Sequence, residues 1–336
     1  MPEVAFAEAI DRAVEHSMAR DPSVVVLGED VPSIRRSLAT RFGADRVRGT
    51  PISESAFLGA GVGAAMAGLR PIVEIMLVDF LGVCFDALLN HAAKLRDLSG
   101  GRWSAPLVVR AACGGGYGDA GQHEQSLWGL LAGVPGLKIV VPSTPADAAG
   151  LMLSAIHDPD PVVFLEHKLL AANWLDWMAG ASRPTVSFDV PASGAMGEVG
   201  DPPVAVPIGE AAQRRSGNDL LIVGVGVGAH RSLEAAAQLA DDGIDAAVLD
   251  LRTVAPLDVA SIVGLASDAG SVLVVDEDYL HFGLAGEVAA VLAEAGAIRK
   301  FARVGPTCTI PYARHLADAV LPSTSAISDA ARTLVR

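Results

Sequence analysis

The feature that most constrains the fold is an alternation of short, mostly apolar runs with longer segments of helical period. The runs are together rich in Val and Ile and include 23–30, 70–77 and 161–167. Between such runs lie the predicted helices Ala5–Ala19, Ser55–Gly68, Gly82–Leu95 and Pro145–His157. A strand that is apolar throughout has no face suited to water, so it must be covered on both sides. The pattern therefore predicts an α/β fold with a mainly parallel sheet between helical layers.

A break in this alternation divides the chain. From about residue 173 to residue 207 the sequence is rich in Pro, Gly, Ser and Ala and has no sustained periodicity. Such a stretch is typical of an inter-domain linker. The alternation resumes beyond it, with apolar runs at 219–226 and 271–278. We predict two doubly wound α/β domains, at 1–172 and 208–336, joined by a linker at 173–207.

Charge and composition exclude several function classes. The chain has 336 residues and a net charge of −14, which argues against nonspecific nucleic-acid binding because that requires Lys and Arg to replace phosphate counterions. The N-terminus has no basic-then-apolar run of a secretory signal. The apolar run Phe57–Leu69 is shorter than the roughly 20 residues of a membrane span. We expect a cytoplasmic protein that binds neither nucleic acid nor membrane.

The segment that begins at Glu54 is built from small residues. Gly59 and Gly63 lie four residues apart, as do Ala60 and Ala64. On a helix each pair lines one face and lets another backbone approach closely. The pattern fits either a helix buried within one domain or a contact with another subunit. By itself, Glu54 could be an acid that stabilises the positive end of a helix dipole.

Several motifs occur in the order and spacing of one known family. The motifs are RGTPISESAFLGAGVGAAMAGLRPIVEI, GQHEQS, GLKIVVPSTPADAAGLMLSAIHDPDPVVFLEHKLL, LDLRTVAPLD and IPYARHLADAVLP. With these motifs the chain resembles the β subunit of the thiamine-diphosphate-dependent decarboxylase component of 2-oxo acid dehydrogenase complexes (pyruvate, branched-chain and acetoin types), within the transketolase-like superfamily.

The resemblance implies an N-terminal domain that binds the pyrimidine of thiamine diphosphate and a C-terminal transketolase-like domain. It implies an oxidoreductase subunit that works with an α subunit. Together they would decarboxylate or cleave a 2-oxo acid or acetoin to a hydroxyalkyl–thiamine intermediate and pass the acyl group to lipoamide.

The resemblance also implies roles for individual residues. Glu54 would hydrogen-bond the pyrimidine ring nitrogen and so allow the cofactor to activate itself. Phe80 would pack on the pyrimidine, and Met76 and Glu29 would lie near the cofactor. His123 would act on the intermediate as it is passed to lipoamide. The alternatives are core packing for the apolar residues and a strand-end acid for Glu29.

Two features depart from the family. Relatives usually have a small residue where Glu124 stands. The segment between Glu29 and Glu54 is shorter than usual, and because it borders the active-site entrance the substrate remains open. Of the remaining histidines, His281 in DEDYLHFG is the one near a predicted site turn.

Part of the cofactor site is missing from the sequence. The superfamily holds the diphosphate and magnesium with a Gly-Asp-Gly motif, which occurs nowhere in this chain. The resemblance therefore implies an α subunit that carries the motif and the magnesium, in a heterotetramer of two α and two β chains. A dihydrolipoyl acyltransferase would be a further partner.

The resemblance implies one further metal site. A potassium ion would bind the backbone carbonyls of Leu107, Ala155, Asp158 and Asp160. Hard cations accept such oxygen ligands. The alternative is a turn stabilised by proline alone.

Other functions compete with this interpretation. The run Gly224-x-Gly226-x-Gly228 after a strand imitates a dinucleotide fingerprint, but its spacing is not that of G-x-G-x-x-G. Half of a split transketolase or a deoxyxylulose-phosphate synthase-like enzyme would share the domain order and Glu54. A non-catalytic scaffold is a third alternative.

Overall fold

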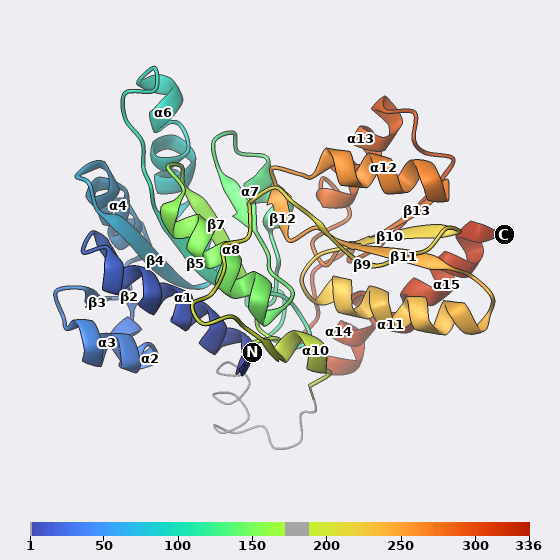
Figure 1. Cartoon of the computed structure of the whole chain (residues 1–336), viewed down its shortest axis with the longest axis horizontal. Coiled ribbons are helices and arrows are strands. Elements are labelled where there is room, and N and C mark those ends of the chain that lie inside the picture. Colours follow the sequence, from blue (N-terminus) through green and yellow to red (C-terminus); the bar gives the residue numbers. More distant parts are fainter. Residues whose placement is uncertain (1, 172–187) are drawn as a thin grey trace.

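The N-terminal part of the chain forms a seven-stranded sheet. The computed structural model describes residues 2–171 and 188–336, so residues 173–187 of the predicted linker lie outside the described residues (Figure 1). The strand order is β12 (Thr253–Ala255), β6 (Lys138–Val140), β7 (Val162–His167), β5 (Val108–Cys113), β4 (Arg70–Leu77), β2 (Val24–Glu29) and β3 (Val47–Thr50). All neighbours pair in parallel except β12, which is antiparallel to β6.

Helices cover both faces of this sheet, as the apolar strands predict. One face packs against α1 (Phe6–Arg20) and α8 (Pro145–His157), which lie side by side (Figure 1). The other packs against α4 (Glu54–Met66), α5 (Leu81–Asp86) and the π-helix η2 (Ala87–Ala92). Successive strand residues point to opposite faces, so Ile72 joins the first core and Val73 the second.

The predicted helix Gly82–Leu95 is wrong as a single α-helix. The chain instead forms α5, η2 and α6 (Leu95–Leu98), with non-helical dihedrals at Cys84. The N–H of Ala93 bonds to the carbonyl of Leu88, five residues back, which gives the wider π turn. A periodicity argument cannot detect this change, because the apolar spacing continues through it. By contrast, α8 begins where predicted, with Thr144 accepting the Asp147 N–H.

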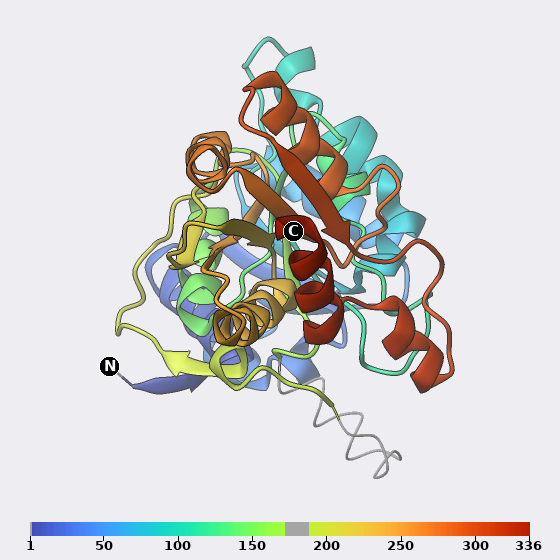
Figure 2. The same ribbon diagram turned by 90° about the vertical axis from the view of Figure 1, so that its right-hand side faces the viewer.

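The C-terminal part forms a second, five-stranded sheet (Figure 2). Its order is β14 (Lys300–Val304), β13 (Ser271–Val275), β10 (Leu220–Gly224), β11 (Ala246–Asp250) and β9 (Ala212–Arg215), antiparallel only at β9. One face packs against α11 (Val227–Asp241) and α15 (Thr324–Val335) and the other against α12 (Val259–Ala269) and α13 (Leu284–Glu294). The prediction of two doubly wound α/β domains is confirmed.

The glycines that imitate a dinucleotide motif have a packing role. They lie at the turn from β10 to α11, where a Cβ on Gly224 would meet the backbone nitrogen of Ala229 at 2.9 Å. Gly226 has a φ of 55°, in the left-handed region that favours glycine. Close strand–helix approach therefore accounts for these residues without a nucleotide.

The remaining elements are short. They are β1 (Glu3–Ala5) paired with β8 (Met196–Glu198), α2 (Val31–Ile34), α3 (Arg36–Phe42), η1 (Val78–Phe80), α7 (Trp128–Ala132), α10 (Ala192–Ala195) and α14 (Arg314–Val320). Within residues 2–171 and 188–336, no helix has the length and apolarity needed to cross a lipid bilayer.

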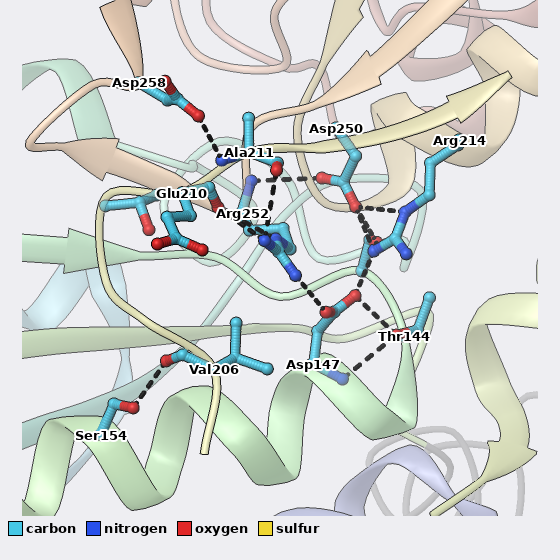
Figure 3. Close-up of polar contacts among 12 residues, drawn as sticks. Thr144, Asp147, Ser154, Val206, Glu210, Ala211, Arg214, Asp250, Arg252 and Asp258 are labelled. Atoms are coloured by element: carbon cyan, nitrogen blue, oxygen red, sulfur yellow. Dashed lines mark hydrogen bonds and ion pairs between the residues drawn. The ribbon is translucent and has the colours of Figure 1, made fainter. Parts of the chain in front are cut away.

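The two domains are joined by more than the linker. Strand β12 follows β11 in the chain but completes the N-terminal sheet, and one hydrophobic core runs through both domains. Figure 3 shows the polar part of this junction: Asp147, at the start of α8, accepts from Arg214 and from Arg252 of the C-terminal part. Arg214 also contacts the buried carboxylate of Asp250 at 2.8 Å. Each of these four charged groups thus has a partner.

A second buried ion cluster ties the N-terminal sheet to its surroundings. Arg110 on β5 donates to Glu166 on β7 at 2.7 Å and to Asp11 on α1 at 3.1 Å. Arg35, from the short segment after β2, donates to Glu74 on β4 at 3.0 Å. Burial alone would raise the pKa of Glu74, but the two guanidinium groups outweigh burial and hold the pKa below its ordinary value of 4.5.

We predict that Arg110→Met destabilises the protein by about 3–5 kcal/mol, because it leaves buried carboxylates without a partner. The free energy of unfolding from urea titrations would measure this. The loss should shrink as the pH falls below about 4.5, because protonation removes the charge that Arg110 balances. Arg12→Ala is the control: its exposed pair with Glu8 should contribute under about 1 kcal/mol. An equal effect from both variants would contradict the prediction.

Candidate functional site

The predicted site residues gather at the carboxyl ends of the central strands. Glu29 is the last residue of β2, Met76 lies one residue before the end of β4, and Glu54 is the first residue of α4. All three side chains are half-buried. In open parallel sheets, ligands bind at this edge, where loops can bring polar side chains together.

Glu29 and Glu54 lie close enough to interact. Burial, the charge of Asp30 and the charge of Glu54 together raise the pKa of Glu29. These two carboxylates therefore share one region, although 25 residues and strand β3 separate them in the chain. Local sequence patterns alone could not establish this proximity, because it depends on how the chain folds back over the sheet edge.

Phe80 and His123 are in direct contact. Phe80 ends the short helix η1 after β4, and His123 lies in the loop between β5 and α7. Their ring centroids are 5.6 Å apart and the rings are nearly perpendicular, at 80°. Such an edge-to-face contact is favourable and fixes the plane of the imidazole.

The start of α4 is joined to the Phe80 segment. Ser55 donates through its hydroxyl to the carbonyl of Val83 at 2.7 Å, and Cys84 lies 3.6 Å from the carbonyl of Phe80. Burial and the nearby charge of Glu54 raise the pKa of Cys84 to about 12. Glu54, Phe80 and His123 therefore surround one region beside α5.

A small cavity of about 30 Å³ lies next to two of the predicted residues. Glu29 and Met76 line it, together with Arg35, Arg110 and the carboxylates of the ion cluster. The segment after Glu29 thus has a definite structural role, because it places Arg35 in the ion cluster under the site.

Glu124 faces the interior of its own loop. Its side chain is buried, and Oε1 accepts the backbone N–H groups of Tyr117, Gly118 and Asp119, the first at 2.7 Å and the last at 3.1 Å. A carboxylate that accepts several N–H groups stabilises a tight loop. The departure from the family pattern therefore concerns the shape of the loop that carries His123.

Sequence reasoning missed Lys168. This side chain is fully buried just after β7 and donates to the backbone carbonyl of His123. Its ammonium also lies 4.9 Å from the centre of the Tyr117 ring. Burial lowers the pKa of Lys168 from its ordinary value. The only signal in the sequence was a lysine directly after an apolar strand.

His281 does not join the site. Its side chain is exposed, whereas Tyr279 from the same turn reaches the His123 loop and donates to Gln125 at 3.0 Å. The sequence analysis identified the turn DEDYLHFG, but it did not identify Tyr279 as the residue that contacts the loop of His123. Only the tertiary structure decides which side chain of a turn points inward.

One face of α4 is open to solvent. Gly59, Ala60 and Gly63 are exposed, and a Cβ added to either glycine would meet nothing within 4 Å. Gly61 differs, because a Cβ there would lie 2.5 Å from Val73. The alternative of a helix buried all round within one domain is therefore wrong.

The residues implied to bind potassium lie around the turn between α8 and β7. They are Leu107, Ala155, Asp158 and Asp160. The carbonyls of Leu107 and Ala155 already accept backbone N–H groups, and Arg70 donates to that of Asp158 at 3.3 Å. Lys138 contacts the Asp158 carboxylate at 2.7 Å. Each carbonyl keeps a second lone pair for another partner. Elsewhere in the described residues, no group of three or more His, Cys, Asp or Glu side chains could hold a metal ion.

Comparison with known proteins identifies both domains. Residues 2–172 match the transketolase pyrimidine-binding domain, and residues 209–327 match the transketolase C-terminal domain. A solved structure titled split gene transketolase, inactive beta4 tetramer, superimposes with a TM-score of 0.78 over 99% of this chain and 98% of that one. At 21% identity this likeness shows the fold alone.

Curated relatives match over most of their length. The β subunit of acetoin:2,6-dichlorophenolindophenol oxidoreductase from Cupriavidus necator is 39% identical over 98% of this chain and 96% of its own. The β subunit of 2-oxoisovalerate dehydrogenase from Bacillus subtilis is 41% identical over 88% and 85%. The β subunit of the pyruvate dehydrogenase E1 component from the same organism is 38% identical over 86% and 85%. The chain therefore belongs to the family of β subunits of acetoin, branched-chain 2-oxo acid and pyruvate dehydrogenases.

Proposed function

We propose that this chain is the β subunit of an oxidoreductase that decarboxylates or cleaves a 2-oxo acid or acetoin and passes the acyl group to lipoamide. The observation that carries the proposal is the contact of Phe80 with His123 beside the carboxylate of Glu54. Family membership supports the same activity. The direct test is to combine the chain with an α subunit and assay a panel of 2-oxo acids and acetoin.

The residues at the strand ends fit the pyrimidine half of thiamine diphosphate. This cofactor supplies a reactive carbanion at its thiazolium carbon when bound. Glu54 would hold a proton at the pyrimidine ring nitrogen, and Phe80 and Met76 would provide the apolar surface on which the ring packs. Glu29 would provide a second carboxyl group. Burial and nearby acids raise its pKa, so it takes up a proton more readily than a free glutamate does.

His123 is suited to proton transfer during acyl transfer. Phe80 fixes the plane of the imidazole, and Lys168 holds the backbone carbonyl of the same residue. An imidazole can donate or accept a proton near neutral pH. We assign His123 to the transfer of the acyl group to lipoamide.

The diphosphate half of the site would come from an α subunit. The chain contains no Gly-Asp-Gly motif, so we place the diphosphate and magnesium on the α chain. The open face of α4 at Gly59, Ala60 and Gly63 lies directly behind Glu54 in the chain and would contact another subunit. We propose a heterotetramer of two α and two β chains that also binds a dihydrolipoyl acyltransferase.

A split transketolase remains the second candidate, because it would use the same fold and the same carboxylate. The substrate panel separates the two. Activity on sugar phosphates, without activity on 2-oxo acids or acetoin, would support the transketolase and contradict our proposal.

We predict that Glu54→Gln lowers turnover by the reconstituted enzyme at least about 100-fold, because an amide cannot supply the protonated acid. Assembly with the α subunit should be unchanged in size-exclusion chromatography, because the side chain keeps its size. Glu8→Gln, at an exposed position of α1, is the matched control and should keep full activity. Turnover by Glu54→Gln within twofold of the unmodified enzyme would remove Glu54 from this role.

We predict that His123→Ala slows acylation of lipoamide by about 100-fold or more, the usual contribution of a positioned acid or base. Substrate oxidation with an artificial dye as electron acceptor should fall much less, because it bypasses lipoamide. His157→Ala, at the exposed end of α8, is the control. Equal losses in both assays would mean that His123 acts before acyl transfer.

We also propose that potassium binds the carbonyls of Leu107, Ala155, Asp158 and Asp160. The carboxylates of Asp158 and Asp160 pair with Lys138, and that of Asp160 also pairs with Arg96. These side-chain charges therefore balance one another, and the second lone pairs of the backbone carbonyls stay available for a cation. Thermal unfolding should then occur at a higher temperature in potassium chloride than in choline chloride of equal ionic strength. Identical unfolding midpoints in the two salts would contradict potassium binding and would mean that Lys and Arg side chains alone stabilise this turn.

A further inference from the structure

The loop that carries His123 is held by the C-terminal domain. The loop runs from residue 114 to residue 127 and joins β5 to α7. Hydrogen bonds join it to the C-terminal domain. The N–H of Gly115 donates to Glu277 Oε1 at 2.6 Å, and the N–H of Gly121 donates to the Ile310 carbonyl at 2.9 Å. The Gly116 carbonyl accepts from Arg314 Nη1 at 2.9 Å, and Gln125 Oε1 accepts from Tyr279 Oη at 3.0 Å. The conformation of the loop therefore depends on residues far along the chain.

The contact at Gln125 leads directly to the site. Gln125 Nε2 donates to Asp79 Oδ1 at 2.7 Å, while Gln125 Oε1 accepts from Tyr279. Asp79 immediately precedes Phe80, and the Phe80 ring lies against His123. One glutamine side chain thus links the segment of Phe80 to the loop of His123.

Chemistry fixes the direction of these hydrogen bonds. A carboxylate only accepts, so the amide nitrogen of Gln125 must face Asp79 and its oxygen must face Tyr279. Tyr279 is then the donor, and burial raises the pKa of its phenol above the ordinary value, so the proton stays on the oxygen. Without that hydroxyl, the half-buried oxygen of Gln125 would lose its donor.

The position of Tyr279 is itself fixed by the junction between the domains. The residues before it, Asp276 and Asp278, accept from Trp128 Nε1 at 2.9 Å and from the Gly129 N–H at 2.8 Å. Both acceptors are buried. The hydroxyl of Tyr279 therefore reaches Gln125 from a segment that is held against α7 on the N-terminal side.

We propose that Tyr279 is a positioning residue for His123, acting through Gln125 and Asp79, so that the C-terminal domain sets the geometry of the acyl-transfer step. The proposal rests on the proposed function of the site. On this proposal Tyr279 acts through Gln125, whose amide links the segment of Phe80 to the loop of His123.

The variant that tests this is Tyr279→Phe, which keeps the ring and removes only the hydroxyl. Loss of one hydrogen bond of about 1 kcal/mol corresponds to about a fivefold change. We expect acylation of lipoamide by the reconstituted enzyme to fall about five- to tenfold in kcat, with KM within twofold. The pH profile of this step should shift, because the surroundings of His123 change, and dye reduction should be less affected.

The matched control is Ser328→Ala. Its hydroxyl donates to Gln238 Oε1 at the same distance of 3.0 Å, but between α15 and α11. This variant should keep the rate and pH profile of the unmodified enzyme. Acylation by Tyr279→Phe within twofold of the unmodified enzyme, with an unchanged pH profile, would overturn the proposal.

A second measurement does not depend on activity. Amide hydrogen exchange in the full β chain should be about fivefold faster across residues 114–127 in Tyr279→Phe and unchanged in α11. Faster loop exchange in a chain that shows no activity with any 2-oxo acid or acetoin would contradict the proposed function alone. Unchanged loop exchange would contradict the role of Tyr279 even if the proposed function holds.

Discussion

The rest of the site depends on the contact of one acidic run, Asp276–Asp278 of the C-terminal domain, with the N-terminal domain. Glu277 is buried between the domains, where it accepts the N–H of Gly115 at 2.6 Å and lies 2.8 Å from the imidazole of His167. Burial alone would raise the pKa of Glu277, but His167 and its hydrogen bonds outweigh burial and lower it. A buried carboxylate of one domain with partners on the other fixes the relative position of the two domains, because any other arrangement leaves the charge unpaired. The conformation of the loop that carries His123 therefore depends on the hydrogen bond between Gly115 and Glu277.

The ion cluster under the strand ends has a related role. Arg110 and Arg35 place two positive charges beneath the edge where Glu29 and Met76 lie, and carboxylates from α1, β4 and β7 balance them. The cluster joins α1 to the middle of the sheet, so the floor of the site is rigid. The segment after β2 contributes to the cluster through Arg35, which is almost fully buried.

In the proposed function, the chain supplies half of a site. Its carboxylates, aromatic ring and histidine suit the pyrimidine end of a cofactor, whereas the sequence lacks the motif that would hold a diphosphate. The open small-residue face of α4 and the proposed cofactor contact at Glu54 lie on one helix. On this proposal, α4 would couple subunit assembly to catalysis.

The sequence by itself determined the layered α/β architecture, because strands such as Leu220–Gly224 are apolar on both faces and can only be buried between helices. Motifs that resemble those of known relatives also led to the prediction that Glu54, Phe80 and His123 are site residues. The sequence could not determine that the Phe80 and His123 rings touch, that Lys168 and Glu124 shape the loop, or that Tyr279 rather than His281 contacts the loop of His123. Those facts depend on contacts between segments up to about 150 residues apart, which only the tertiary structure decides because local periodicity carries no information about which loops meet.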